Sequence, residues 1–245
     1  PADHLEANII LAQSRQLLVQ IVAQQLPEGL DFGARPLPVF DGERVDGQRV
    51  DPQAAAGLDG VAYRTHPRPV SGDAREMAGT VEAGFVVVMP DCVEHGDRKT
   101  DAWETRVMLN GWAFICDVME RTRQEGSALL DAVLGLPYVS AAAPQVGGAS
   151  MGGLIAQMVF AEEKRYVSMT SIVGRSSFYQ ADEWCRRAQV GTWCDEWCAE
   201  FATQSHPERF IDRPVLFMDG GEDTNCPAAV NAETVRLINA AGGAA

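Results

Sequence analysis

The sequence predicts an α/β fold: a single domain spanning residues 1–245, with a mostly parallel central sheet flanked by helices. From residue 57 onward, strand-like apolar segments alternate with segments of helical periodicity, which is typical of a parallel sheet. The segment 84–91, GFVVVMPD, is almost continuously apolar, as expected of a strand buried on both faces. With 245 residues, 46% of them hydrophobic, the chain can bury a core without disulfide or metal staples.

The part of the chain before residue 57 contains two predicted features. Residues 5–26 are predicted to form a helix, because their apolar positions recur at helical spacing and Pro27 and Gly29 follow them. Residues 33–52 are rich in Pro, Gly and Asp, which indicates turns and one short hairpin.

The remaining elements alternate between strand and helix. A short strand is expected at 61–63 and a helix at 75–83, ahead of the strand at 84–91. A long helical segment should follow at 105–134, interrupted near Gly126. The last predicted elements are strands at 145–148, 167–173 and 214–218 and helices at 151–163 and 228–240.

Charge and cysteine content restrict the functional class. A formal net charge of -14 makes nucleic acids and anionic membranes unsuitable partners. The six cysteines are scattered, which favours reduced thiols and a cytoplasmic protein. No apolar run approaches the ~20 residues that span a bilayer, and the first residues do not resemble a signal peptide. We therefore expect a small-molecule substrate, with the choice between monomer and homodimer left open.

The chemistry is indicated by the segment 148–152, Gly-Ala-Ser-Met-Gly, which has the form G-x-S-x-G between a predicted strand and a predicted helix. Such a tight turn presents Ser150 as a nucleophile, and glycine is needed at 148 and 152 because side chains there would meet the neighbouring backbone. The helix that begins after the serine directs its N–H groups at the site, so Met151 N–H is the candidate oxyanion donor. The alternative, a phosphate-binding turn, lacks both the G-x-G-x-x-G spacing and the P-loop lysine.

A candidate acid follows the last predicted strand. The strand runs into the loop 219–223, Asp-Gly-Gly-Glu-Asp, at the edge of the sheet where the serine turn also lies. Asp223 would accept a hydrogen bond from an imidazole and stabilise its charged form. Asp219 and Glu222 are nearby rivals, and a solvated turn acid is the alternative interpretation.

With these motifs the chain resembles the α/β-hydrolase superfamily, and within it the branch of dienelactone hydrolases and prolyl-oligopeptidase-like esterases. The resemblance covers roughly residues 61–240. It implies hydrolysis of an ester, thioester or amide through an acyl-enzyme, with a serine–acid–histidine triad and neither cofactor nor metal. The stretches that carry it are the loop at His66, residues 85–98 with Asp91 and His95-Gly96-Asp97-Arg98, residues 148–153, and residues 214–227.

The chain departs from the family at the triad histidine, which the family places in a loop after the last strand. This sequence ends 22 residues past Asp223 without a histidine there. We prefer the explanation that a final strand and helix carrying the base are missing from the sequence. Two others stay open: the protein is a pseudo-hydrolase, or an existing histidine substitutes. The candidates for substitution are His4, His66, His95 and His206.

A second departure concerns the other oxyanion donor. In the family a glycine follows the histidine of the oxyanion loop, but here Pro67 stands after His66 and has no N–H to give. The backbone N–H of Arg68 is therefore our candidate for the second donor.

Residues 176–209 are predicted to be an insertion rich in tryptophan and cysteine. Three Trp-Cys pairs occur there, at 184–185, 193–194 and 197–198. A helical lid lining an apolar acyl pocket and a small satellite core are both consistent with this composition. A zinc site built from Cys185, Cys194 and Cys198 is not expected, because the C-x-x-C pairs of structural zinc sites are absent.

Together these observations predict a serine esterase-type hydrolase that cleaves a carboxylic ester through Ser150, with thioesters and amides as related substrates. The rival is a hydrolase-fold binding protein that lacks the triad histidine and has lost catalysis.

Overall fold

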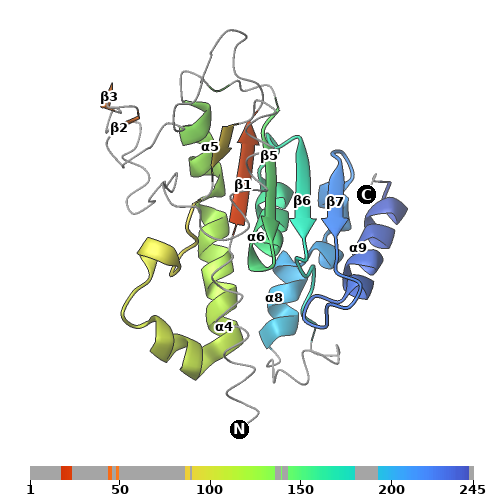
Figure 1. Ribbon diagram of the computed structural model, residues 1–245. Helices are drawn as coiled ribbons and strands as arrows, with labels where there is room; N and C mark the ends of the chain where they lie inside the picture. Colours follow the sequence, from red (N-terminus) through yellow and green to blue (C-terminus); the bar gives the residue numbers. More distant parts are fainter. Residues whose placement is uncertain are drawn as a thin grey trace.

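The computed structural model describes residues 18–23, 44–45, 48–49, 86–88, 90–135, 139, 143–179 and 193–242. Its centre is a five-stranded sheet with the strand order β4-β1-β5-β6-β7. Strands β5, β6 and β7 pair in parallel, whereas β1 is antiparallel to both of its neighbours, β4 and β5. Four strands thus share one direction and β1 runs against them (Figure 1). The strands are β1 (Leu18–Ala23), β4 (Val86–Val88), β5 (Gln145–Ala149), β6 (Ser168–Ile172) and β7 (Val215–Met218).

The predicted helix at 5–26 is wrong over Leu18–Ala23, which form strand β1. This segment pairs Leu18 with Ala149 of β5 and Ile21 with Val88 of β4. Its sequence, LVQIVA, is apolar and rich in β-branched residues, which favour a strand enclosed between two others. Tertiary pairing therefore overrides the helical spacing that the sequence shows. The rest of 5–26 lies outside the described residues.

The hairpin expected within 33–52 is confirmed. Strands β2 (Arg44–Val45) and β3 (Gln48–Arg49) pair antiparallel as a separate two-stranded sheet. The strand predicted at 61–63 and the helix predicted at 75–83 lie outside the described residues.

The helices follow the sequence prediction closely. The long segment at 105–134 is divided where expected, because α4 ends at Gln124 and α5 begins at Gly126. Helix α4 is also kinked at Gly111, whose φ of 25° and ψ of -100° are not helical. The helices are α4 (Trp103–Gln124), α5 (Gly126–Leu134), α6 (Met151–Glu162), α8 (Trp193–Phe201) and α9 (Ala228–Ala240), with single 3₁₀ turns η1 (Gly96–Arg98), η2 (Thr203–Ser205) and η3 (Pro207–Phe210).

Helix α6 lies at the centre of the core. It packs against β1, β5 and β6, and α4 packs against it in turn (Figure 1). Every residue from 152 to 160 is buried, so the helix has no solvent-facing stripe over these nine positions. At the α5–α6 contact, a Cβ on Gly126 would lie 2.8 Å from a methyl carbon of Val159. Within the described residues, no helix is long and apolar enough to cross a membrane.

Candidate active site

Ser150 occupies the sharp turn between β5 and α6 with a strained backbone. Its φ of 53° and ψ of -121° are rare for a residue with a side chain. Its N–H donates to the carbonyl of Ile172 at 2.9 Å, which extends the β5–β6 pairing into the turn. Although Ser150 is the N-cap residue of α6, its side chain makes no capping hydrogen bond. Ser150 is half-buried, and its hydroxyl is therefore not used as a helix cap.

The first turn of α6 has N–H groups available beside this serine. Gly153 N–H and Leu154 N–H donate to the Ser150 carbonyl at 3.0 and 3.3 Å. The N–H groups of Met151 and Gly152 precede the first intrahelical hydrogen bond and have no acceptor within the helix. These N–H groups and the positive end of the helix dipole favour negative charge at this position.

The turn is held by a close approach that the sequence analysis did not predict. A Cβ on Gly153 would lie 2.8 Å from Ser171 Oγ and 3.1 Å from the carbonyl of Gly148. Gly148 and Gly152, the glycines that the motif emphasises, are both buried. The doubled glycine at 152–153 was the signal in the sequence, because a third glycine beside a G-x-S-x-G motif suggests a contact of backbone with backbone.

A buried amide connects α6 to β6 and the residues that follow it, beside the Ser150 turn. The Gln157 side chain donates to Ser171 Oγ at 3.0 Å and to the Gly174 carbonyl at 3.3 Å. Its oxygen accepts a hydrogen bond from Thr203 Oγ1 at 2.6 Å. Gln157 has no exposed surface, so these three bonds satisfy groups that would otherwise be costly to bury.

A second buried amide continues the connection to the end of β7. Asn231 of α9 donates to the Gly174 carbonyl at 2.9 Å and to Asp219 Oδ1 at 2.7 Å. Its own oxygen accepts the Ser176 N–H at 3.2 Å. Asn231 was not predicted from the sequence, although it lies on the buried stripe of α9 with Thr234 and Ile238. Asp219 is thus committed to a structural hydrogen bond.

Asp223 lies in the loop after β7. Its Oδ1 accepts the N–H groups of Asn225 at 2.8 Å and Cys226 at 2.9 Å. Because β5, β6 and β7 are parallel, this loop and the Ser150 turn both leave the carboxyl edge of the sheet, with β6 between them (Figure 1). Burial, followed by the charge of Asp223, raises the pKa of the Cys226 thiol to about 11.

A buried guanidinium joins the loop after β6 to the Asp223 loop. Arg175 is only 2% exposed and donates from Nε to the Ser177 carbonyl at 2.7 Å. Its Nη1 donates to the Asn225 carbonyl at 3.2 Å. No periodicity or motif in the sequence marks this arginine, because it stands in an irregular segment.

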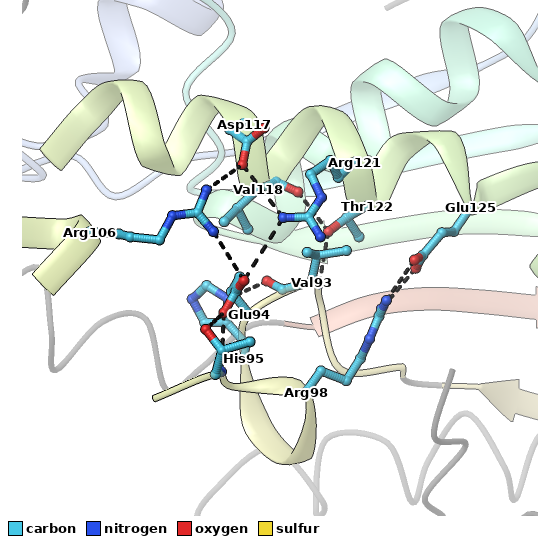
Figure 2. Close-up of polar contacts among 11 residues, drawn as sticks. Val93, Glu94, His95, Arg98, Arg106, Asp117, Val118, Arg121, Thr122 and Glu125 are labelled. Carbon is cyan, nitrogen blue, oxygen red and sulfur yellow. Dashed lines mark hydrogen bonds and ion pairs between the residues drawn. The ribbon is translucent and has the colours of Figure 1, made fainter. Parts of the chain in front are cut away.

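The loop after β4 carries a buried carboxylate (Figure 2). Glu94 is 5% exposed, has a φ of 60°, and accepts hydrogen bonds from Thr100 N–H at 3.1 Å and Thr100 Oγ1 at 2.7 Å. Arg106 of α4 donates to it at 3.2 Å, and Arg121 lies 3.9 Å away. Asp117 pairs with both arginines. These bonds from Thr100, with the arginine charges, lower the pKa of Glu94 despite the opposing effect of burial.

Two of the four histidines lie within the described residues, and both have contacts. His95 is 7% exposed, its Nδ1 lies 3.0 Å from the Val93 carbonyl, and its ring packs edge-on against Trp103. Burial lowers the pKa of His95. The Nε2 of His206 lies 2.9 Å from the Ala199 carbonyl, and its Nδ1 lies 3.4 Å from Glu208. The remaining candidate residues, His4, His66, Arg68 and Cys185, lie outside the described residues.

The described part of the segment 176–209 packs into the main core. Helix α8 buries Cys194 and Cys198, which belong to the same hydrophobic cluster as Phe178 and Phe210. The satellite core considered for this composition is therefore continuous with the main one. The role of the segment as a lid stays a prediction.

Comparisons with known proteins include a distant structural likeness. Neither a protein-family model nor a curated protein sequence matches the chain. The chain is similar to a solved structure from a structural and mechanistic study of two prolyl endopeptidases, with a TM-score of 0.46 and 14% sequence identity. The match covers 66% of this chain and 24% of that one, so this chain spans about a quarter of that structure's length.

Proposed function

We propose that the chain is a serine hydrolase that cleaves a carboxylic ester through an acyl-enzyme on Ser150. The supporting observation is the backbone of Ser150, with its φ of 53° and ψ of -121° between a parallel strand and a buried helix. A strained turn of this kind persists only where the surroundings enforce it, and it presents a side chain that does not cap the helix.

In this proposal Ser150 Oγ attacks the ester carbonyl carbon while a base removes its proton. The resulting oxyanion accepts the Met151 N–H at the start of α6, and Arg68 N–H is the proposed second donor. Collapse of the tetrahedral intermediate breaks the bond to the alcohol, which leaves with a proton. Water then hydrolyses the acyl-enzyme by the same route in reverse, restoring the Ser150 hydroxyl.

Asp223 is the proposed acid that orients the base. Two backbone N–H groups hold its Oδ1, which fixes the carboxylate and leaves Oδ2 to accept a hydrogen bond from an imidazole. Asp219 suits this role less well, because the Asn231 amide already binds its Oδ1. The base is a histidine in the family that the sequence resembles, and the experiment below tests whether Ser150 is activated as a base would activate it.

A second candidate function is that of a hydrolase-fold binding protein without turnover. The contacts of the two described histidines favour it. His206 has a neighbour at each ring nitrogen, and His95 is buried with its Nδ1 held by a carbonyl. A serine without a base keeps its proton and is a weak nucleophile.

Labelling with a fluorophosphonate probe, followed by peptide mapping, distinguishes the two functions. The hydrolase should be labelled on Ser150 and should hydrolyse p-nitrophenyl acetate, and Ser150→Ala should lower turnover by about a thousandfold or more. Ser127→Ala, at an exposed serine of α5, is the matched control and should leave labelling unchanged. Folded protein that stays unlabelled at Ser150 would support the binding protein and overturn the hydrolase.

A further inference from the structure

Two cysteines lie one helical turn apart on α8. Cys194 and Cys198 are both reduced, their sulfurs are 4.0 Å apart, and neither side chain is more than 1% exposed. Helix geometry separates residues i and i+4 by about 6.2 Å between Cα atoms. Disulfides bridge Cα separations of roughly 4.4–6.8 Å, a range that includes this pair. They also need Cβ atoms roughly 3.5–4.5 Å apart, closer than the ~5–6 Å of helical i, i+4 neighbours, so bond formation requires this turn of α8 to open and distort.

The backbone of Phe178 contacts both sulfurs. Its N–H donates to Cys198 Sγ at 3.1 Å, and its carbonyl accepts a hydrogen bond from Cys194 Sγ at 2.6 Å. Hydrogen bonding from Cys194, together with the Phe178 N–H, lowers the pKa of Cys198 against the opposing effect of burial. A lower pKa increases the fraction of thiolate, which is the form that oxidants attack.

Another buried cysteine shows the contrasting case. Cys92 has no exposed surface, and burial raises the pKa of its thiol far above the ordinary range. Cys92 and Cys116 therefore provide internal references for buried thiols in the same protein.

We propose that Cys194 and Cys198 form a redox-active dithiol that a hydroperoxide converts into a disulfide within α8. The Cys198 thiolate attacks one peroxide oxygen and the O–O bond breaks. The products are a sulfenic acid on Cys198 and an alkoxide or hydroxide, which takes a proton from solvent to become an alcohol or water. Cys194 sulfur then attacks the Cys198 sulfur. The S–S bond forms, the S–O bond breaks, and the departing oxygen leaves as water with the Cys194 proton. The peroxide gains two electrons and the two thiols lose two.

The disulfide would also change how Phe178 is held. Oxidation removes the S–H that serves the Phe178 carbonyl, leaving that buried oxygen without this donor. The Phe178 ring packs against Trp112, with centroids 5.5 Å apart, and lies 5.4 Å from the guanidinium of Arg175. The site of oxidation thus contacts the segment that continues to the Asp223 loop through Arg175 and Asn225.

Peptide mapping of the intact protein tests the proposal. The protein is treated with graded hydrogen peroxide, and the remaining thiols are alkylated before digestion. We expect the peptide with Cys194 and Cys198 to lose two hydrogens and both alkylation sites, about tenfold faster than Cys92 or Cys116 is lost, and dithiothreitol to reverse the change. Low urea should accelerate the reaction, because the buried sulfurs react through local opening of α8.

Variants then separate the two roles. Cys194→Ser should stop at a sulfenic acid on Cys198 that dimedone traps, whereas the matched Cys116→Ser should still form the disulfide. The wild-type mapping stands even if a variant does not fold. The proposal is overturned if both thiols are still alkylated after oxidation, if the disulfide joins either of them to another cysteine such as Cys185, or if bound zinc protects the pair.

Discussion

Gly153 and Gly174 meet backbone to backbone beneath the Ser150 turn. A Cβ on Gly153 would lie 2.9 Å from the Cα of Gly174, and a Cβ on Gly174 would lie 2.8 Å from the Cα of Gly153. Real Cβ atoms do not approach other atoms this closely in packed proteins, so the first turn of α6 and the segment after β6 require glycine at both positions.

Alanine at either position should therefore destabilise the fold. We expect Gly153→Ala and Gly174→Ala each to lower the free energy of unfolding by about 1–3 kcal/mol, because the added methyl group displaces backbone. Urea denaturation followed by circular dichroism measures this. Gly221→Ala is the control, since nothing lies within 4 Å of its Cβ position. Equal stability of Gly153→Ala and Gly221→Ala would refute the close approach.

Replacing Asn231 should be costly despite its small size. Asn231→Ala leaves the Gly174 carbonyl and the Ser176 N–H without this partner in a buried site, for a loss of about 2–4 kcal/mol. Thermal and urea unfolding measure the loss. Gln124→Ala removes an exposed amide from α4 and should change stability by less than about 0.5 kcal/mol. A comparable effect of the two substitutions would argue against the buried connection.

Because the backbone of Ser150 is strained, replacing this residue with glycine should affect the stability of the protein and its proposed activity in opposite directions. Glycine tolerates a φ of 53° without the steric cost that a Cβ imposes, so Ser150→Gly should raise the free energy of unfolding by about 1 kcal/mol. Ser150→Ala keeps the Cβ and should leave the strain in place. Both variants would lose the proposed nucleophile. If glycine is no more stabilising than alanine in urea denaturation, the turn is not strained.

His95 should make stability depend on pH. Burial lowers the pKa of His95, so the folded state binds its proton less readily than the unfolded chain does. Its stabilising contribution is complete above the unfolded pKa of about 6.5 and decreases as the pH falls below that value. His95→Gln should flatten the fall in urea midpoint between pH 8 and pH 5, with His206→Gln as the matched substitution. A wild-type slope in His95→Gln would contradict this prediction.

The elements that the sequence predicted well are those whose local pattern and tertiary environment agree. Helix α9 has the predicted bounds Ala228–Ala240, and α6 differs from its prediction by one residue, because each is a long segment with consistent local preference. The error at Leu18–Ala23 arose where the same residues suit a helix face and a central strand, and only the pairing with β4 and β5 decides between them.

Within the candidate site, the local motif could be predicted from the sequence, whereas the contacts between distant residues could not. The Ser150 turn was predictable because strand, glycines and helix are adjacent in the sequence. Gln157, Arg175 and Asn231 were missed because their partners lie on other elements, and no spacing rule connects them. Polar residues on an otherwise buried helix stripe are the one local hint that such contacts leave.

The reversed strand β1 has a consequence for how the chain reaches its native state. The sheet's centre is closed by joining Leu18 to Ala149, two residues that are separated by more than half of the chain's length. On a ribosome, β1 would emerge early and could pair with β4 first, but its other edge would stay unpaired until β5 had been synthesised. Such distant pairing loses loop-closure entropy before any stabilising contact has formed. Refolding from urea should therefore be slow, and assembly of the central strands should be its rate-limiting step.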